Sequence, residues 1–197
     1  MTVSLIELAH RFLFPALWAS WAIYWWLSSR AVKTTVRHEP LGSRLLHVVP
    51  LLLALPLMLP DELPGRFLQD RLFPWTPWEF WPAAAVTASG LAFAVWARLH
   101  LGRNWSGTVT IKQDHELIDT GPYAIVRHPI YTGLLIAFIG SAWARDEWRG
   151  VPAVVLAWLA IWRKLRFEER WMLEIFGERY ADYRRRVPAL IPFLRTK

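Results

Sequence analysis

The sequence contains no cysteine, so disulfides, thiolate metal sites and a cysteine nucleophile are all excluded. Charged residues are also scarce, because Asp, Glu, Lys and Arg make up 20% of the 197 residues while 54% belong to the apolar classes. A chain of this composition is neither disordered nor a coat for nucleic acid, since both need abundant charge. We therefore expect no nucleic acid among its partners.

Closely spaced histidines are missing as well. The six histidines are at positions 10, 38, 47, 100, 115 and 128, and no two of them lie three or four residues apart. Because ligands on one helix must share a face, this spacing excludes histidine-rich di-iron enzymes. The chain also lacks a glycine-rich phosphate-binding loop. We expect no bound metal ion.

Long uncharged apolar segments are what the sequence has in abundance. Five segments lack Asp, Glu, Lys and Arg altogether: Phe12 to Ser29, Leu45 to Pro60, Phe80 to Ala97, Pro129 to Ala144, and Gly150 to Trp162. A helix needs roughly 20 residues to cross a hydrocarbon core of about 30 Å, so the shorter segments need flanking residues or tilt. The sequence predicts an all-α integral membrane protein with about five transmembrane helices and a C-terminal cytoplasmic amphipathic helix.

The basic residues are distributed unevenly between the two sides of such a protein. If the five spans alternate in direction, 18 of the 23 Lys and Arg residues fall on the side that holds the C-terminus. Cytoplasmic segments carry this excess, so we expect a multi-pass protein in contact with membrane lipids, with its N-terminus outside and its C-terminus in the cytoplasm. The count fits an endoplasmic reticulum membrane equally well, but we expect a bacterial inner membrane.

The last two spans are joined by a very short connection at residues 145–149. A connection of this length makes them an antiparallel hairpin whose two open ends face the cytoplasm. The loop at 101–128 then lies next to the segment that begins at Arg163. The two most polar stretches of the chain are therefore predicted to meet at one membrane surface.

The first polar stretch leads into the fourth span. Pro129 suits the first turn of a helix, which places Arg127 and His128 at its positive N-terminal end. A carboxylate would be held there by free backbone N–H groups together with the guanidinium. The alternative is that Arg127 only flanks the membrane and that Tyr131 is an interfacial aromatic residue.

The second polar stretch follows the fifth span as an amphipathic helix. Glu169 falls within its apolar stripe, four residues after Leu165. A buried carboxylate needs a cation or a hydrogen-bond donor as its partner. The alternative is a set of surface ion pairs along the helix, Lys164 with Glu168 and Arg166 with Glu169.

Taken in order, these residues resemble one known family. The matching positions are Gly121, Pro122, Tyr123, Arg127, His128, Pro129, Tyr131, Gly133, Glu168, Glu169, Phe176, Gly177, Tyr180, Tyr183, Val187, Pro188 and Pro192. They resemble the isoprenylcysteine carboxyl methyltransferase family, to which enzymes that methylate phospholipid amines are related. The resemblance covers about residues 98–194, and it implies a division into three N-terminal spans at 1–97 and a catalytic methyltransferase-like region at 98–197.

The resemblance implies methyl transfer from S-adenosylmethionine, which enters from the cytoplasm, to a lipophilic small-molecule or prenylated acceptor, which enters from the bilayer. Glu168 or Glu169 would face cofactor hydroxyl or amino groups, and Tyr180 and Tyr183 would close the pocket. The other residues implied to shape the cofactor pocket are Leu117, Gly121, Tyr123, Arg127, His128, Tyr131 and Gly133.

The acceptor's chemistry decides what else the site needs. A carboxylate is already nucleophilic and needs only a positioning cation, for which Arg163, Arg166 and Arg170 are candidates. An amine must first lose a proton, and Glu168 or Glu169 with a raised pKa would serve as the base. Two alternatives remain at this stage: a sterol-type membrane reductase that uses NADPH, and a non-catalytic membrane partner or small transporter.

Overall fold

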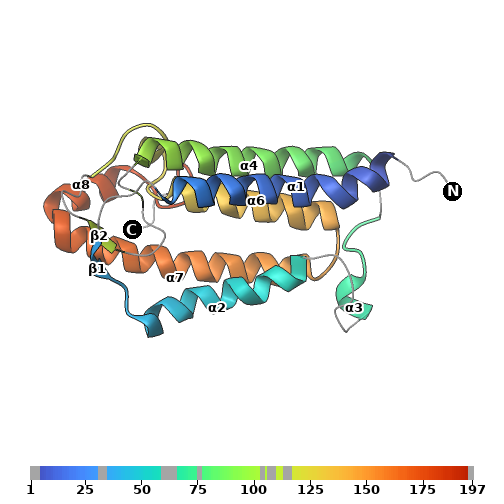
Figure 1. The fold of residues 1–197 in the computed structure, drawn as a ribbon, viewed down its shortest axis with the longest axis horizontal. Helices are drawn as coiled ribbons and strands as arrows, with labels where there is room; N and C mark the ends of the chain where they lie inside the picture. Colours follow the sequence, from blue (N-terminus) through green and yellow to red (C-terminus); the bar gives the residue numbers. More distant parts are fainter. Residues whose placement is uncertain are drawn as a thin grey trace.

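The protein is described by a computed structural model that covers residues 5–30, 35–58, 66–74, 77–102, 105, 110–112 and 117–194. Five long helices run along its long axis (Figure 1). They are α1 (Leu5–Ser28), α2 (Leu41–Met58), α4 (Phe80–Leu101), α6 (Pro129–Arg145) and α7 (Gly150–Phe176). Each corresponds to one predicted span. By length and composition alone, two of the described helices, α2 and α4, are long and apolar enough to cross a membrane.

The bounds of the helices differ from the prediction where charged residues are involved. The α1 helix begins at Leu5 rather than Phe12, and α7 continues past Trp162 to Phe176 as one unbroken helix. The predicted spans were bounded by the first charged residue on each side, whereas a helix continues through charged residues that it can expose on one face. The predicted amphipathic helix is therefore the second half of α7. After Gly177, whose φ is 50°, the chain turns into α8 (Glu178–Arg186).

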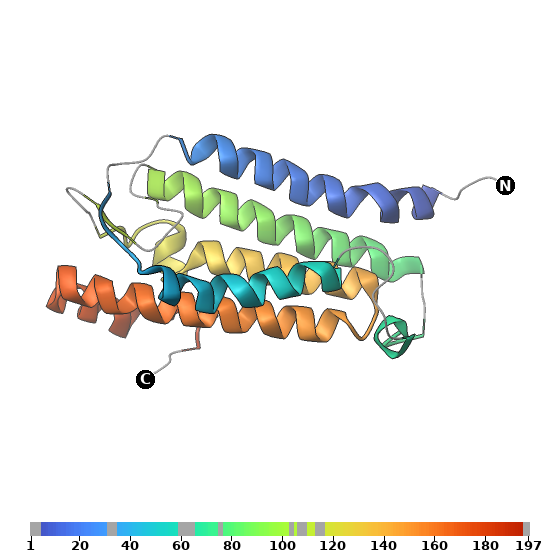
Figure 2. The same ribbon diagram turned by 60° about the horizontal axis from the view of Figure 1, so that its bottom comes forward.

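The long helices form two layers. Figure 1 shows α1, α4 and α6 above α7 and α2, and Figure 2 shows the same arrangement after a 60° rotation. The α4 helix packs against α1 and α6, while α7 packs against α6 and α2. In both views α8 lies at one end of the bundle, beside the end of α7, and α3 (Arg66–Gln69) lies at the other end. Polar segments distant in sequence thus gather at the α8 end.

The closest helix contact is the seam between α4 and α6. A Cβ atom added to Gly133 would lie 2.5 Å from the carbonyl oxygen of Gly90, and one added to Gly90 would lie 2.5 Å from the carbonyl oxygen of Gly133. Only a residue without a side chain allows the two backbones to approach so closely. Gly133, which the family resemblance assigned to the cofactor pocket, therefore lies in this seam.

A two-stranded antiparallel sheet departs from the all-α prediction. Strand β1 (Thr35–His38) pairs with β2 (Thr110–Lys112), with a register shift between Thr35 and Arg37. Strands of three and four residues are too short to display an alternating pattern in the sequence. The pairing ties the segment between α1 and α2 to the segment after α4, and both were predicted on the same side of the membrane.

The opposite end of the bundle is closed by the turn between α6 and α7. Asp146 ends α6 in the left-handed conformation, with φ of 51°. Its carboxylate accepts a hydrogen bond from the Phe73 backbone N–H at 3.2 Å, and its carbonyl accepts one from Leu72 at 3.2 Å. The predicted hairpin is confirmed, and its turn also anchors the segment that follows α3. A short 3-10 helix, η1 (Pro77–Glu79), then leads into α4.

Candidate active site

The candidate site is built around the N-terminus of α6. The chain reaches it through the single turn α5 (Pro122–Ile125), and Pro129 occupies the first turn of α6 as predicted. The backbone N–H of Arg127 donates to the Pro188 carbonyl at 2.8 Å, and that of His128 donates to the Ala189 carbonyl at 3.0 Å. These two N–H groups are therefore bonded to the segment that follows α8 and are not among the free N–H groups that could hold an anion.

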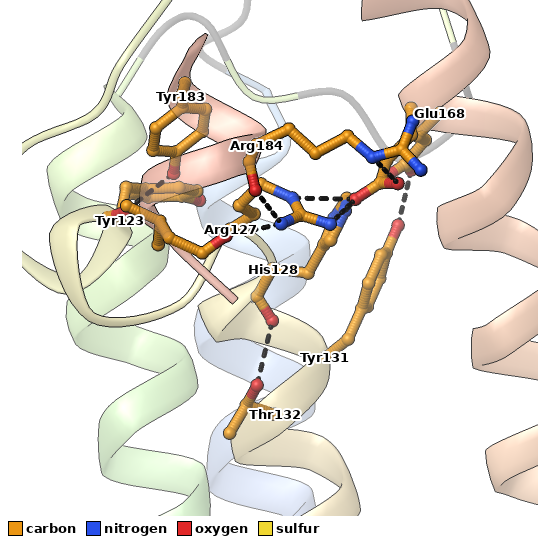
Figure 3. Close-up of polar contacts among 10 residues, drawn as sticks. Tyr123, Arg127, His128, Tyr131, Thr132, Glu168, Tyr183 and Arg184 are labelled. Atoms are coloured by element: carbon orange, nitrogen blue, oxygen red, sulfur yellow. Dashed lines mark hydrogen bonds and ion pairs between the residues drawn. The ribbon is translucent and has the colours of Figure 1, made fainter. Parts of the chain in front are cut away.

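Arg127 holds a carboxylate of the protein itself. Its Nε and Nη2 donate to Oε1 of Glu169 at 2.8 and 2.6 Å, and its Nη1 donates to the carbonyls of Arg184, at 3.1 Å, and Val187 (Figure 3). Only 3% of the Arg127 side chain and 7% of the Glu169 side chain are exposed. The prediction that the two polar stretches meet is confirmed. The Arg127–Glu169 ion pair, with the carbonyl contacts of Arg127, connects the start of α6 to α7 and to the C-terminal segment.

The surroundings of Glu169 determine its charge. Burial alone would raise the pKa of its carboxyl, but the hydrogen bond and charge of His128, followed by those of Arg127, outweigh burial and lower the pKa to about 2. The carboxylate is therefore ionised throughout the physiological range. A general base for an amine acceptor requires a raised pKa, so the lowered pKa of Glu169 argues against its use as that base and leaves Glu168 as the other predicted candidate.

Glu168, on the next position of α7, is more accessible. Its Oε1 accepts a hydrogen bond from the Tyr131 hydroxyl at 2.5 Å, and its Oε2 lies 3.7 Å from Nδ1 of His128 (Figure 3). The His128 and Tyr131 rings stack at 5.7 Å, and Lys164 Nζ lies 5.3 Å from the centre of the Tyr131 ring. A quarter of the Glu168 side chain is exposed, against 7% for Glu169. Glu168 is thus the carboxylate that a small molecule can reach more readily.

His128 links the two carboxylates. Its Nε2 lies 3.2 Å from Oε1 of Glu169, while its Nδ1 faces Glu168. The ring therefore lies between the buried Arg127–Glu169 pair and the more exposed Glu168–Tyr131 pair.

A cavity of about 330 Å³ opens between α7 and α8. Its lining residues are Arg166, Glu169, Arg170, Leu173 and Arg184. The volume is at the lower end of what small-molecule sites occupy. Three guanidinium groups against one carboxylate give this cavity a positive balance, which favours an anionic group. Arg184 was not singled out by the sequence, because a run of three arginines near a C-terminus is typical of a solvated surface.

Aromatic side chains seal the site on its other flank. Tyr180 and Tyr183 of α8 pack with Leu117 and Val187 in a buried cluster, and the Tyr183 hydroxyl donates to the Tyr123 carbonyl at 2.6 Å. Burial raises the pKa of the hydroxyls of Tyr123, Tyr180 and Tyr183, so all three are protonated at neutral pH. The cluster excludes water from the buried ion pair.

Two further predicted residues lie at the margin of this group. Gly121 has φ of 59°, and a Cβ atom there would lie 2.7 Å from the His100 ring, so its role is to let the turn pass over that ring. Arg163 points toward α2, where its Nη2 donates to Ser43 at 2.9 Å. Neither residue touches the carboxylates of α7 in the described contacts.

The comparisons with known proteins agree on one family. A family model described as phospholipid methyltransferase matches residues 78–179. Protein-S-isoprenylcysteine O-methyltransferase B of Arabidopsis thaliana is 30% identical over 96 residues, which are 47% of this chain and 49% of the plant protein. Protein-S-isoprenylcysteine O-methyltransferase of Mus musculus is 32% identical over 133 residues, which are 59% of this chain and 46% of the mouse protein.

A bacterial relative and a solved structure extend the comparison. The cobalt-zinc-cadmium resistance protein CzcN of Cupriavidus metallidurans is 30% identical over 131 residues, 64% of this chain and 59% of the relative. The structure of the eukaryotic intramembrane Ras methyltransferase ICMT matches with a TM-score of 0.53 and 29% identity, covering 60% of this chain and 43% of that one. The chain spans about half the length of the curated relatives it matches.

Proposed function

Because the chain belongs to the phospholipid methyltransferase family, whose members are S-adenosylmethionine-dependent integral membrane methyltransferases, we propose that it methylates a lipophilic acceptor at the membrane. The reaction closest to this chain is carboxyl O-methylation of an isoprenylcysteine-type molecule, since two of the relatives above are named for that reaction. The observation that carries the proposal is the meeting of Arg127, His128 and Tyr131 with Glu168 and Glu169 at one end of the bundle.

The residues present fit S-adenosylmethionine. Its hydroxyl and amino groups need an accessible carboxylate, which Glu168 provides. Its own carboxylate needs a cation, and Arg166 and Arg170 line the cavity beside Glu169. An aromatic face contributes about 0.5–2 kcal/mol toward a cation, but the Tyr131 ring already contacts His128 and Lys164, so we assign the positive charge of the cofactor to no ring. When bound, the cofactor supplies a methyl group that a nucleophile takes by in-line displacement.

The chain's own residues then position and enclose the reactants. Arg127 holds Glu169 and the C-terminal carbonyls, which makes Arg127 a positioning residue rather than a direct ligand. Tyr131 fixes one oxygen of Glu168 and leaves the other toward His128. Leu117, Tyr180 and Tyr183, which pack together beside Tyr123, would flank the cofactor without lining the α7–α8 cavity, and Gly121 would shape the turn next to them. Displacement at a methyl group gains chiefly from alignment and exclusion of water, so this arrangement is sufficient.

A carboxylate acceptor suits the site better than an amine. The lowered pKa of Glu169 and its ion pair with Arg127 make this carboxylate a poor base for removing a proton from an amine. Arg163 has a buried Nη1 with no hydrogen-bond partner among the described residues, so it has a donor to offer an acceptor carboxylate. We propose the basic α8 end as the cytoplasmic side, because the cofactor is a soluble cytoplasmic molecule and this end carries the positive excess.

Calorimetry of purified protein in detergent tests the proposal. We expect Glu168→Gln to weaken S-adenosylmethionine binding about tenfold or more, because a charged hydrogen bond contributes about 1.5–3 kcal/mol. Glu178→Gln, an exposed carboxylate on α8, is the matched control and should bind like the wild type. A wild type that binds NADPH but not S-adenosylmethionine would refute the proposal and favour a reductase.

A further inference from the structure

A second polar cluster lies outside the site described above, between α2 and the middle of α7. Glu39 precedes α2, Ser43 and His47 follow on its first two turns, and Arg163 reaches them from α7. Ser43 Oγ donates to Oε1 of Glu39 at 2.6 Å and accepts from Nη2 of Arg163 at 2.9 Å. Nε2 of His47 lies 3.7 Å from Oε2 of Glu39. The four side chains thus form one connected group.

This cluster is buried and incompletely bonded. Only 1% of the Glu39 side chain and 6% of the His47 side chain are exposed. Across the part of the chain that the structure describes, six buried side-chain nitrogen or oxygen atoms have no hydrogen-bond partner, and three of them are Glu39 Oε2, His47 Nδ1 and Arg163 Nη1. Leaving such atoms unpaired is costly, so each of them calls for an explanation, such as a ligand that pairs with it.

The unpaired atoms define the chemistry of a ligand that would satisfy them. Arg163 Nη1 has a proton to donate and attracts an anionic oxygen. Glu39 Oε2 accepts, and it requires an N–H or O–H donor on the ligand. His47 Nδ1 can take either role according to its tautomer. The matching molecule carries an anionic oxygen and a donor a few ångströms apart.

The cluster is also placed to serve the methyl-transfer site. Glu168 lies five positions after Arg163 on α7, which is about 7.5 Å along the helix axis. Lys164, next to Arg163, lies over the ring of Tyr131, whose hydroxyl is bonded to Glu168. Glu39, Ser43 and His47 precede residue 78, where the family match begins. They are therefore suited to selecting the acceptor rather than holding the shared cofactor.

We propose that Glu39, Ser43, His47 and Arg163 bind the polar head of the methyl acceptor, and that this head carries an anionic oxygen together with a neighbouring N–H donor. This inference rests on the proposed methyltransferase function. Two sources have that chemistry: a modified cysteine with a free carboxylate and an amide, and phosphatidylethanolamine with a phosphate and an ammonium group. A fatty acid lacks the donor and matches only half of the cluster.

Three acceptors separate the contributions of the two charged residues. N-acetyl-S-farnesylcysteine has the carboxylate and the amide N–H, S-farnesylthiopropionic acid has the carboxylate alone, and dioleoylphosphatidylethanolamine has the phosphate and the ammonium group. Initial rates with labelled S-adenosylmethionine in detergent micelles give KM for each acceptor. Thermal shift without cofactor gives acceptor binding independently of turnover.

We expect Arg163→Gln to raise KM about tenfold for every acceptor that the wild type uses, since it removes the contact to the anionic oxygen. Glu39→Gln should raise KM about tenfold only for acceptors with the N–H donor and leave S-farnesylthiopropionic acid unchanged. The calorimetric Kd for S-adenosylmethionine should stay within twofold in both variants, which shows that they are folded. Arg44→Gln, an exposed charge on the same turn of α2, should match the wild type.

The two proposals fail in different ways. A wild type that binds no S-adenosylmethionine and methylates none of the three acceptors refutes the methyltransferase function. The head-binding role is refuted if Glu39→Gln and Arg163→Gln leave acceptor KM and the acceptor-induced thermal shift within twofold of the wild type. It is also refuted if the wild type binds S-farnesylthiopropionic acid as tightly as N-acetyl-S-farnesylcysteine, because the donor would then contribute nothing.

Discussion

Glu169 is the side chain that connects most parts of the candidate site. It accepts two hydrogen bonds from Arg127, lies 3.2 Å from Nε2 of His128, and lines the cavity shared with α8. Its position in an apolar stripe correctly predicted that it would need a partner. The partner's identity was open from the sequence alone, because Arg127 is 42 residues away and nearer arginines on α7 offered simpler pairs.

Acid should weaken the protein through this residue. The pKa of the Glu169 carboxyl is about 2 in the folded chain and 4.5 ordinarily. A lowered pKa contributes stability that is complete above pH 4.5 and is lost as the pH falls toward 2. Thermal unfolding in detergent between pH 7 and pH 2 should show this loss.

The Glu169→Gln variant isolates the effect. At pH 7 it should lose about 3 kcal/mol of stability, because it leaves a buried guanidinium without its charge partner. Its unfolding temperature should also vary less than the wild type's below pH 4.5. An acid limb identical to that of the wild type would contradict the assignment. Glu178→Gln, an exposed carboxylate, serves as the control.

The α4–α6 pair is the element that positions the site, since α6 carries His128 and Tyr131 at its N-terminal end. The small residues of these two helices do not reveal their partner in the sequence, because a small residue serves contacts within or between chains equally. The structure pairs Gly90 with Gly133 and Gly140 with Thr87. The length of the apolar segments was enough to predict that these helices exist. Which helices pack against each other depends on how their surfaces fit together.

Gly133→Ala should destabilise the protein by about 1–3 kcal/mol, because the new methyl group would overlap the Gly90 carbonyl. Gly42→Ala is the matched control, since nothing lies within 4 Å of the added Cβ on α2. Melting temperatures in detergent compare the two variants. Equal melting temperatures would contradict the close α4–α6 approach.

Across the whole molecule, the polar site lies at one end of the helix bundle, and the charged turn between α6 and α7 lies at the other end. In Figure 2 the long helices run between these ends, with α8 at one and α3 at the other. The segments that pack against the site come from residues far apart in sequence, including the carbonyls of Pro188 and Ala189. Backbone partners of this kind leave no residue-type signal, so the sequence did not predict them.

The absence of cysteine makes the membrane orientation directly testable. Trp78→Cys, at a side chain of η1 that is 80% exposed, should react with a membrane-impermeant maleimide on intact cells. Arg185→Cys, on α8, should react only after the membrane is permeabilised. The reverse pattern would contradict the orientation inferred from the basic residues.

The five helices and the convergence of the two polar stretches were predictable, because uncharged length and a short hairpin turn determine both. The β1–β2 pair and the Glu39 cluster were not, since short strands show no period and a single histidine in an apolar helix is more often a packing residue. Arg127 was singled out from the sequence as an anion-binding residue, but its guanidinium is committed to groups of the protein. Only the folded chain reveals which donors are already used.

Transfer of a labelled methyl group tests the central claim most directly. Purified wild-type protein in detergent is incubated with labelled S-adenosylmethionine and a panel of prenylcysteine, fatty-acid and phosphatidylethanolamine acceptors, and the label in the lipid extract is measured. We predict label in the prenylcysteine acceptor, released by mild base as expected for a carboxyl methyl ester, and its loss in Glu168→Gln. Label in no acceptor, with wild-type protein that is folded by thermal unfolding, would contradict the account.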